Sequence, residues 1–195
     1  MTIEKGQPWG EPVDRPDDLL VVDSDAAVAS AIIDDPAHPI GVSGGDLHRS
    51  LGSPAPRREM QRLPIDLLSC RFDGRSTVAV AHVVIRGSWW RGPIVAVMNV
   101  DHVGDWNVAP RAHPNDGRCD VVEVAATMTV RERWQAARRL AGGTHVPHPA
   151  ITTAAVRERS WEFERPMTVW VDGVRAGTAR TASIEVVSDA GAVYV

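Results

Sequence analysis

Two Asp-Gly pairs constrain the fold of this chain more than any other sequence feature, because each separates two runs of β-type residues. Asp73-Gly74 follows the apolar run 65–72 and precedes a second run over residues 77–85. Asp172-Gly173 follows residues 167–171, in which apolar side chains alternate along the chain. An Asp-Gly pair readily adopts the backbone conformation of a two-residue hairpin turn. Each pair therefore predicts two neighbouring antiparallel strands.

Further short apolar runs extend this pattern over the C-terminal two thirds of the chain. They cover residues 94–100, 119–124, 157–163, 183–187 and 192–195. One longer helix is predicted over residues 128–140, where Gly142-Gly143 ends it. Many short strands with turn signals predict a mainly β protein with some α-helix, arranged as an antiparallel sandwich or barrel.

The N-terminal part has a different pattern. Short apolar runs over residues 19–22 and 39–42 flank an alanine-rich segment that follows Ser24 and Asp25, two favourable helix N-caps. This pattern predicts a small βαβ fragment. Four segments follow from these patterns: an extended arm (1–17), the α/β fragment (18–52), a linker (53–62) and a β domain (63–195).

Length and composition are those of a soluble globular chain. With 195 residues, of which 44% are apolar and 24% charged, the chain can bury a core without disulfide bonds. The net charge of −4 gives no reason to expect a nucleic-acid partner. The two cysteines, Cys70 and Cys119, form no disulfide framework, and no signal peptide or transmembrane run is present. We therefore expect a cytoplasmic protein that is not transmembrane.

The charge is unevenly distributed. Residues 1–47 carry ten acidic and two basic side chains, whereas residues 48–195 carry fifteen acidic and nineteen basic ones. A solvated acidic segment explains the difference, and the alternative is that the basic remainder meets an anionic ligand or a lipid head group.

The turn Gly44-Gly45-Asp46 is a candidate phosphate-binding site. It lies between a predicted strand and a predicted helix, where backbone N–H groups can bind an anion. A lone glycine pair is also typical of an ordinary tight turn.

Two groups of histidines are candidate metal ligands. His145 and His148 form one group, and the pair Asp101-His102 with His113 forms the other. Structural hydrogen bonding in polar loops is the favoured explanation for both groups, because a zinc site needs three or four well-placed ligands.

The segment 99–124 resembles the C-terminal domain of bacterial diacylglycerol kinase-like lipid kinases. Its features are an Asn–Gly loop, an Ala-Pro-x-Ala segment and an Asp-Gly-x-x-Asp-Val segment. The residues that match this pattern in order are Asn99, Gly104, Ala109, Pro110, Ala112, Asp116, Gly117, Asp120 and Val121. The resemblance covers roughly residues 63–195, and it implies an antiparallel β-sandwich.

The resemblance also implies a structural Mg²⁺ in the Asp-Gly-x-x-Asp loop. Carried over by spacing, its ligands are the carbonyl of His113, the carboxylate of Asp116 and the carbonyl of Arg118. One carboxylate with carbonyls and water suits a hard cation. The alternative is that this loop is only a tight turn.

The sequence departs from the family pattern at two functional positions. The family's phosphate-binding turn reads Gly-Gly-Asp-Gly-Thr, whereas Leu47 and His48 follow Asp46 here. The family's nucleotide-binding domain is also much larger than residues 18–52, so ATP is an unlikely ligand. In the family a Glu follows the late Asp-Gly and resembles the general base, but here the residue is Val174. Asp172 is a possible replacement for this base, although the resemblance implies that its role lies in the turn.

These departures favour a lipid kinase-like protein that has lost phosphotransfer and acts as a ligand- or partner-binding domain. The alternatives are an active ATP-dependent lipid kinase completed by another chain, and a metal-dependent hydrolase. A lipid or another phosphate-bearing small molecule is the expected partner, and a homo-oligomer is compatible with the sequence. Trp89-Trp90 and Arg91 could form an apolar, basic lip for an acyl chain, or the tryptophans could pack at a sheet edge.

Overall fold

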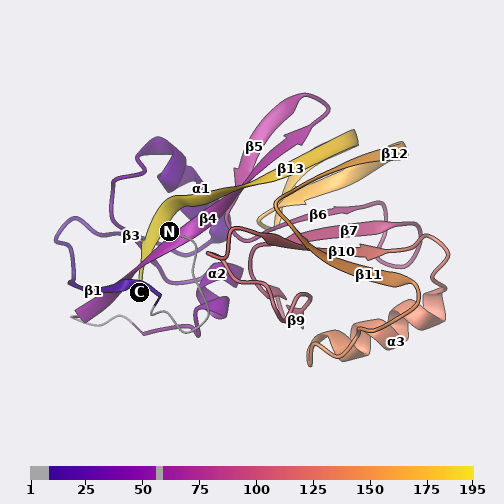
Figure 1. Cartoon of the computed structure of the whole chain (residues 1–195), viewed down its shortest axis with the longest axis horizontal. Helices are drawn as coiled ribbons and strands as arrows, with labels where there is room; N and C mark the ends of the chain where they lie inside the picture. Colours follow the sequence, from indigo (N-terminus) through magenta and orange to yellow (C-terminus); the bar gives the residue numbers. More distant parts are fainter. Residues whose placement is uncertain (1–8, 56–58) are drawn as a thin grey trace.

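The computed structural model describes residues 9–55 and 59–195 (Figure 1). A small α/β segment lies at one end of the molecule, a two-layered β-structure forms the middle, and one helix covers the other end. The strands are β1 (Glu11–Asp14), β2 (Leu20–Val22), β3 (Ile40–Val42), β4 (Glu59–Phe72), β5 (Arg75–Ala79), β6 (His82–Arg86), β7 (Ile94–Met98), β8 (His102–Val103), β9 (Trp106–Asn107), β10 (Cys119–Val124), β11 (Ile151–Val156), β12 (Glu158–Val171) and β13 (Val174–Tyr194). The helices are α1 (Asp25–Asp34), α2 (Gly45–Ser50) and α3 (Val130–Leu140).

Both predicted Asp-Gly hairpins are confirmed. Asp73-Gly74 joins β4 to β5, and Asp172-Gly173 joins β12 to β13, with antiparallel pairing on either side of each turn. In both turns the two residues have positive φ, 46° and 81° in the first and 47° and 77° in the second. These values are the ones that a tight hairpin requires and that Asp-Gly tolerates.

The strands form a mainly antiparallel β-sandwich, as the sequence predicts. The hydrogen-bonded order is β1-β4-β13-β12-β6-β7-β10-β11, with β5 on β4. Strands β4, β5, β6, β7, β10, β12 and β13 share one apolar core, which includes Leu68, Ile85 and Val97. Cys70 and Cys119 belong to the same core and are unpaired, so they contribute as buried apolar side chains.

The run over residues 77–85 is interrupted, and it forms two strands instead of one. β5 ends at Ala79 and β6 begins at His82. Val80 and Ala81 are fully buried, so the apolar pattern is continuous where the chain leaves one layer and enters the other. Because Val80 and Ala81 are as apolar as the strand residues on either side, the sequence pattern does not mark the break between β5 and β6.

Two strands lie partly or wholly within the predicted arm and linker. Within the arm, β1 pairs with β4, and the indole of Trp9 donates a hydrogen bond to the carbonyl of Pro64 at 3.1 Å. β4 begins at Glu59, inside the predicted linker 53–62, because its first residues pair with β1. The remaining arm residues 1–8 and linker residues 56–58 lie outside the described part of the chain.

The N-terminal α/β segment shares a core with the sandwich. β2 and β3 are parallel and flank α1, which is the predicted βαβ fragment, and β3 also pairs with the end of β13. Val28 and Ile32 of α1 pack with Ile65 of β4 and Val193 of β13. The approach is close, because a Cβ on Gly191 would come within 2.7 Å of Ile32. The segment is therefore fixed against the sandwich.

Helix α3 begins two residues later than predicted, at Val130. Thr129 is its N-cap: the Thr129 hydroxyl accepts from the Glu132 N–H, and the Glu132 carboxylate accepts from the Thr129 N–H. This capping box fixes the start of the helix. Met128 precedes the cap and is buried beneath the helix. In the described part of the chain, no helix has the length and apolar character needed to cross a membrane.

Candidate functional site

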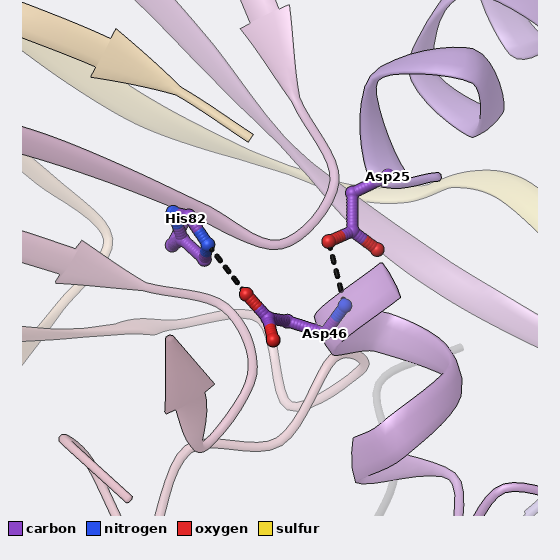
Figure 2. A group of neighbouring side chains, drawn as sticks. All are labelled: Asp25, Asp46 and His82. Carbon is purple, nitrogen blue, oxygen red and sulfur yellow. Dashed lines mark hydrogen bonds and ion pairs between the residues drawn. The ribbon is translucent and has the colours of Figure 1, made fainter. Parts of the chain in front are cut away.

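Three polar side chains meet where the α/β segment contacts the sandwich. Asp25 is the first residue of α1, Asp46 lies in the first turn of α2, and His82 is the first residue of β6 (Figure 2). One potential ligand atom of each lies within 4.8 Å of the other two. Asp25 and His82 are buried, and Asp46 is largely so.

Asp25 fills the anion-binding side of the Gly44-Gly45-Asp46 turn. Its carboxylate accepts hydrogen bonds from the backbone N–H groups of Asp46 at 2.7 Å and Leu47 at 3.0 Å. Gly45 has φ +88°, and a Cβ there would lie 2.3 Å from Asp25 Oδ1, so the glycine is needed for this close approach. The donors expected to bind a phosphate are therefore occupied by a carboxylate of the same chain.

The charges of the three groups are coupled. Burial raises the pKa of Asp25 to about 6, although two backbone N–H groups oppose the rise. Burial disfavours a charge on Asp46 and on His82, but their hydrogen bond of 2.9 Å and the charges around them together outweigh it. This contact lowers the pKa of Asp46 and raises that of His82, which favours a carboxylate–imidazolium pair.

Asp172 lies close to this cluster and is committed to the fold. Its buried carboxylate accepts hydrogen bonds from the backbone N–H groups of Val80 and Ala81 at 2.9 Å and of His82 at 3.0 Å. These bonds hold the chain where β5 gives way to β6. Burial raises the pKa of Asp172. The next residue but one, Val174, is 58% exposed and presents no titratable group.

The predicted magnesium loop is built around Asp66, which is not among the residues predicted from the sequence. This fully buried carboxylate of β4 accepts from the N–H of Gly117 at 2.7 Å and from the Asn115 side chain at 3.3 Å. Asp116 itself accepts from the N–H of Arg118 at 3.0 Å, as in an ordinary Asx turn. A lone Asp within the apolar run 63–72 was the available signal for Asp66.

A buried side-chain oxygen in this loop is suited to a hard cation. Oδ1 of Asn115 is buried, and it has no hydrogen-bond partner among the described residues. Burial raises the pKa of Asp116, and the charge of Asp66 contributes to the rise. A cation held by Asp116 and by the carbonyls of His113 and Arg118 would offset this negative charge. The magnesium site therefore stays a prediction.

The predicted histidine groups do not assemble into metal sites. Over residues 9–55 and 59–195, none of these histidines belongs to a group of three metal-ligating side chains. His102 lies 2.7 Å from Asp101, whereas the ring of His113 packs edge-on against Trp9. His145 is buried, and burial lowers its pKa. The residues that the fold brings together are instead Asp25, Asp46 and His82.

An apolar cavity of about 150 Å³ lies between α3 and the sheet. Helix residues Ala136 and Leu140 form one wall, and sheet residues such as Val84 and Val122 form the opposite wall. Trp89 lines the cavity and packs edge-on against Trp106, another lining residue, with ring centroids 5.1 Å apart.

Arg133 fixes the helix over this cavity. Its guanidinium donates hydrogen bonds to the backbone carbonyls of Met128 at 3.1 Å, Trp89 at 3.2 Å and Ala125 at 3.0 Å, and also to Gly92. The backbone carbonyls of the loops around the cavity therefore provide hydrogen-bond acceptors for this buried guanidinium.

The outer surface near the cavity combines tryptophan with arginine. Trp90, which lines the cavity, is 45% exposed, and Trp134 on α3 is 51% exposed. The guanidinium of Arg138 lies over the Trp134 ring, 4.7 Å from its centroid. The other exposed arginines of this region are Arg91, Arg131 and Arg139. Exposed tryptophan beside arginine is typical of surfaces that meet lipid head groups.

Comparison with known proteins gives one matching family and several similar folds. The family described as the YegS C-terminal NAD kinase beta sandwich-like domain matches residues 69–195. None of the curated proteins compared with the sequence matches it.

Two similar solved structures come from Bacillus anthracis str. Sterne. One, described as a diacylglycerol kinase, has a TM-score of 0.62 and 14% sequence identity over 90% of this chain and 75% of that chain. The other, described as a candidate diacylglycerol kinase, has a TM-score of 0.67 and 15% identity over 90% of this chain and 77% of that chain. At these identities the likeness concerns the fold.

Proposed function

Because this chain belongs to the family of the YegS C-terminal NAD kinase beta sandwich-like domain, we propose that it binds a lipid acyl chain without phosphorylating the lipid. The family match also confirms the resemblance to diacylglycerol kinase-like lipid kinases. A hydrolase built on the predicted histidine groups is not supported, because those groups do not assemble.

The observation that carries the binding proposal is the cavity between α3 and the sheet. An apolar cavity of about 150 Å³ has room for a guest of roughly the size of benzene. This volume suits one segment of an acyl chain. The rest of the lipid would lie along the exposed Trp90 and Trp134, with its head group near the arginines of α3.

Three features support the loss of phosphotransfer. Asp25 occupies the backbone N–H groups of the phosphate-binding turn. Asp172 uses both carboxylate oxygens to hold backbone N–H groups, so it is poorly placed to serve as a base. Val174 cannot accept a proton, and general-base catalysis contributes roughly 10²–10⁴-fold to a rate.

Binding is tested with dodecanoate, titrated calorimetrically into the wild-type protein and two variants. Ala136→Leu fills the cavity from the helix, so it should weaken binding at least tenfold. Gln135→Leu makes a similar change at the exposed neighbouring position and should leave the affinity unchanged. Equal affinities for all three proteins, or no binding to the wild type, would contradict the proposal.

Phosphotransfer is tested with radiolabelled Mg-ATP and a panel of vesicles that contain diacylglycerol or related lipids. We expect no protein-dependent label in any lipid. Robust labelling that depends on the protein would show that the chain is an active kinase.

A further inference from the structure

We propose that Asp25, Asp46 and His82 bind one divalent transition-metal cation, which links the N-terminal α/β segment to the sandwich. The donors come from three elements that are separate in sequence, α1, α2 and β6 (Figure 2). Two carboxylate oxygens and one imidazole nitrogen form a mixed donor set of the kind that Zn²⁺ accepts. A hard cation such as Mg²⁺ prefers oxygen ligands alone.

The spacing of the donor atoms fits a metal after a small adjustment. The three atoms already lie within 4.8 Å of one another, and His82 Nε2 lies 2.9 Å from Asp46 Oδ2. Metal–ligand bonds of about 2.0–2.2 Å place neighbouring ligands of a tetrahedral site roughly 3.3 Å apart. Small torsions of the two carboxylates would therefore close the site without a backbone change.

The buried charge around the cluster favours a cation. The charges of Asp46 and Asp172 act on Asp25, and the charges of all three carboxylates act on His82. Besides His82, the basic group whose charge reaches Asp46 is Arg49, which is itself paired with Asp105 at the surface. Buried carboxylates are normally paired or bound to metal. One divalent ion would supply the missing positive charge.

The imidazole of His82 is available as a ligand. Its ring is buried, and Nδ1 has no hydrogen-bond partner in the part of the chain that the structure describes. The contact that holds a proton on Nε2 is the one with Asp46 Oδ2 at 2.9 Å, and the ion would replace that proton. When a metal binds at Nε2, the proton can move to Nδ1, or be lost to solvent from the imidazolium.

The site would have three protein ligands, and water would complete the coordination. Each oxygen of Asp25 accepts one backbone N–H, and Oδ1 of Asp46 accepts the N–H of Gly104 at 2.9 Å. These bonds orient the carboxylates, as outer contacts do in established metal sites, and each oxygen keeps a second lone pair for the ion.

Metal binding is tested on protein stripped with EDTA, dialysed and titrated with ZnCl₂, MnCl₂ or MgCl₂. We expect one Zn²⁺ per chain by calorimetry and a saturable rise in melting temperature. At a hundredfold excess over Kd the rise should be roughly 5–10 °C. In Asp116→Ala, which lacks the predicted magnesium ligand, Mg²⁺ should give a much smaller rise than Zn²⁺. Absence of a one-to-one Zn²⁺ complex would overturn the proposal.

Variants locate the ion. His82→Gln and Asp46→Asn should each lower Zn²⁺ affinity at least tenfold, with folding of the metal-free proteins checked by circular dichroism. His102→Gln, in the more exposed Asp101–His102 pair, and Asp116→Ala, in the predicted magnesium loop, should keep the affinity of the wild type. If either control variant lost Zn²⁺ affinity, or if both cluster variants kept it, the ion would bind elsewhere in the protein.

A measurement on the wild type keeps the test independent of variant folding. Co²⁺ in place of Zn²⁺ should give visible absorption that saturates at one equivalent, and Zn²⁺ should displace it. The His82 ring signals should broaden in the NMR spectrum with the same stoichiometry. Broadening at another histidine instead would refute the site. Dodecanoate binding does not involve these residues, so the two proposals can fail separately.

Discussion

The carboxylate of Asp25 accepts a hydrogen bond from the backbone N–H of Asp46 at 2.7 Å, on the side of the turn where a phosphate would bind. A second bond, from the Leu47 N–H, completes the occupation of the turn. An internal carboxylate thus takes the place of an external anion, and it adds negative charge that repels a nucleotide.

We therefore predict that Mg-ATP binds no more tightly than about millimolar, or roughly −4 kcal/mol. ATP at a concentration equal to that Kd adds only about 0.4 kcal/mol of stability. In a thermal-shift titration the melting temperature should move by no more than roughly 1–2 °C. A shift of several degrees that saturates at micromolar ATP would refute this prediction.

Asp25 should also make stability depend on pH. Its pKa is about 6 in the folded protein, against an ordinary value of 3.8 in an unfolded chain, so the folded chain binds more protons between these values. The Asp25 contribution to the free energy of unfolding is therefore full below pH 3.8 and is lost as the pH rises through 6. Between about pH 4 and pH 7 the loss is roughly 2 kcal/mol.

The measurement compares wild type and Asp25→Asn by urea denaturation at several pH values, in the presence of EDTA. The amide side chain of the variant does not titrate, so the stability of the wild type relative to the variant should fall by that amount from about pH 4 to pH 7. Parallel pH profiles for the two proteins would show that Asp25 titrates normally.

Asp172→Ala should destabilise the fold strongly. The change leaves the buried N–H groups of Val80, Ala81 and His82 without their acceptor, and each unpaired donor costs about 1–3 kcal/mol. We expect a loss of at least about 3 kcal/mol in the free energy of unfolding, measured with urea.

Asp73→Ala is the matched control for Asp172→Ala. Asp73 occupies the same position in the other Asp-Gly hairpin, with φ 46° against 47°, and also accepts backbone N–H groups, from Arg180 and Thr181. These groups are exposed, so water replaces the lost bonds and the cost should be clearly smaller. Equal losses would mean that the turn, and not the buried network, determines the effect.

The predicted magnesium loop is tested through Asp116. If Asp116 anchors a divalent ion, EDTA should lower the melting temperature of the wild type, and Mg²⁺ should restore it. Asp116→Ala should melt at a lower temperature than the wild type, and Mg²⁺ should not raise its melting temperature after EDTA treatment. Identical wild-type melting curves with and without EDTA would reject the metal and leave an Asx turn.

The sequence alone determined the local elements and the family. The Asp-Gly hairpins, strand β10 over Cys119–Val124 and the body of helix α3 depend on periodicity and turn chemistry that lie within a few residues. The motif over residues 99–124 and the match over residues 69–195 are likewise properties of the sequence.

Tertiary structure alone decided how the polar groups are used. Asp25 meets Asp46 across 21 positions, Asp46 meets His82 across 36, and Asp172 meets Ala81 across 91. Such contacts arise only when β4 and β13 bring the α/β segment onto the sandwich, and no local pattern marks them in advance. The cavity beneath α3 has the same origin, because its walls come from a helix and strands that become neighbours only in the folded chain.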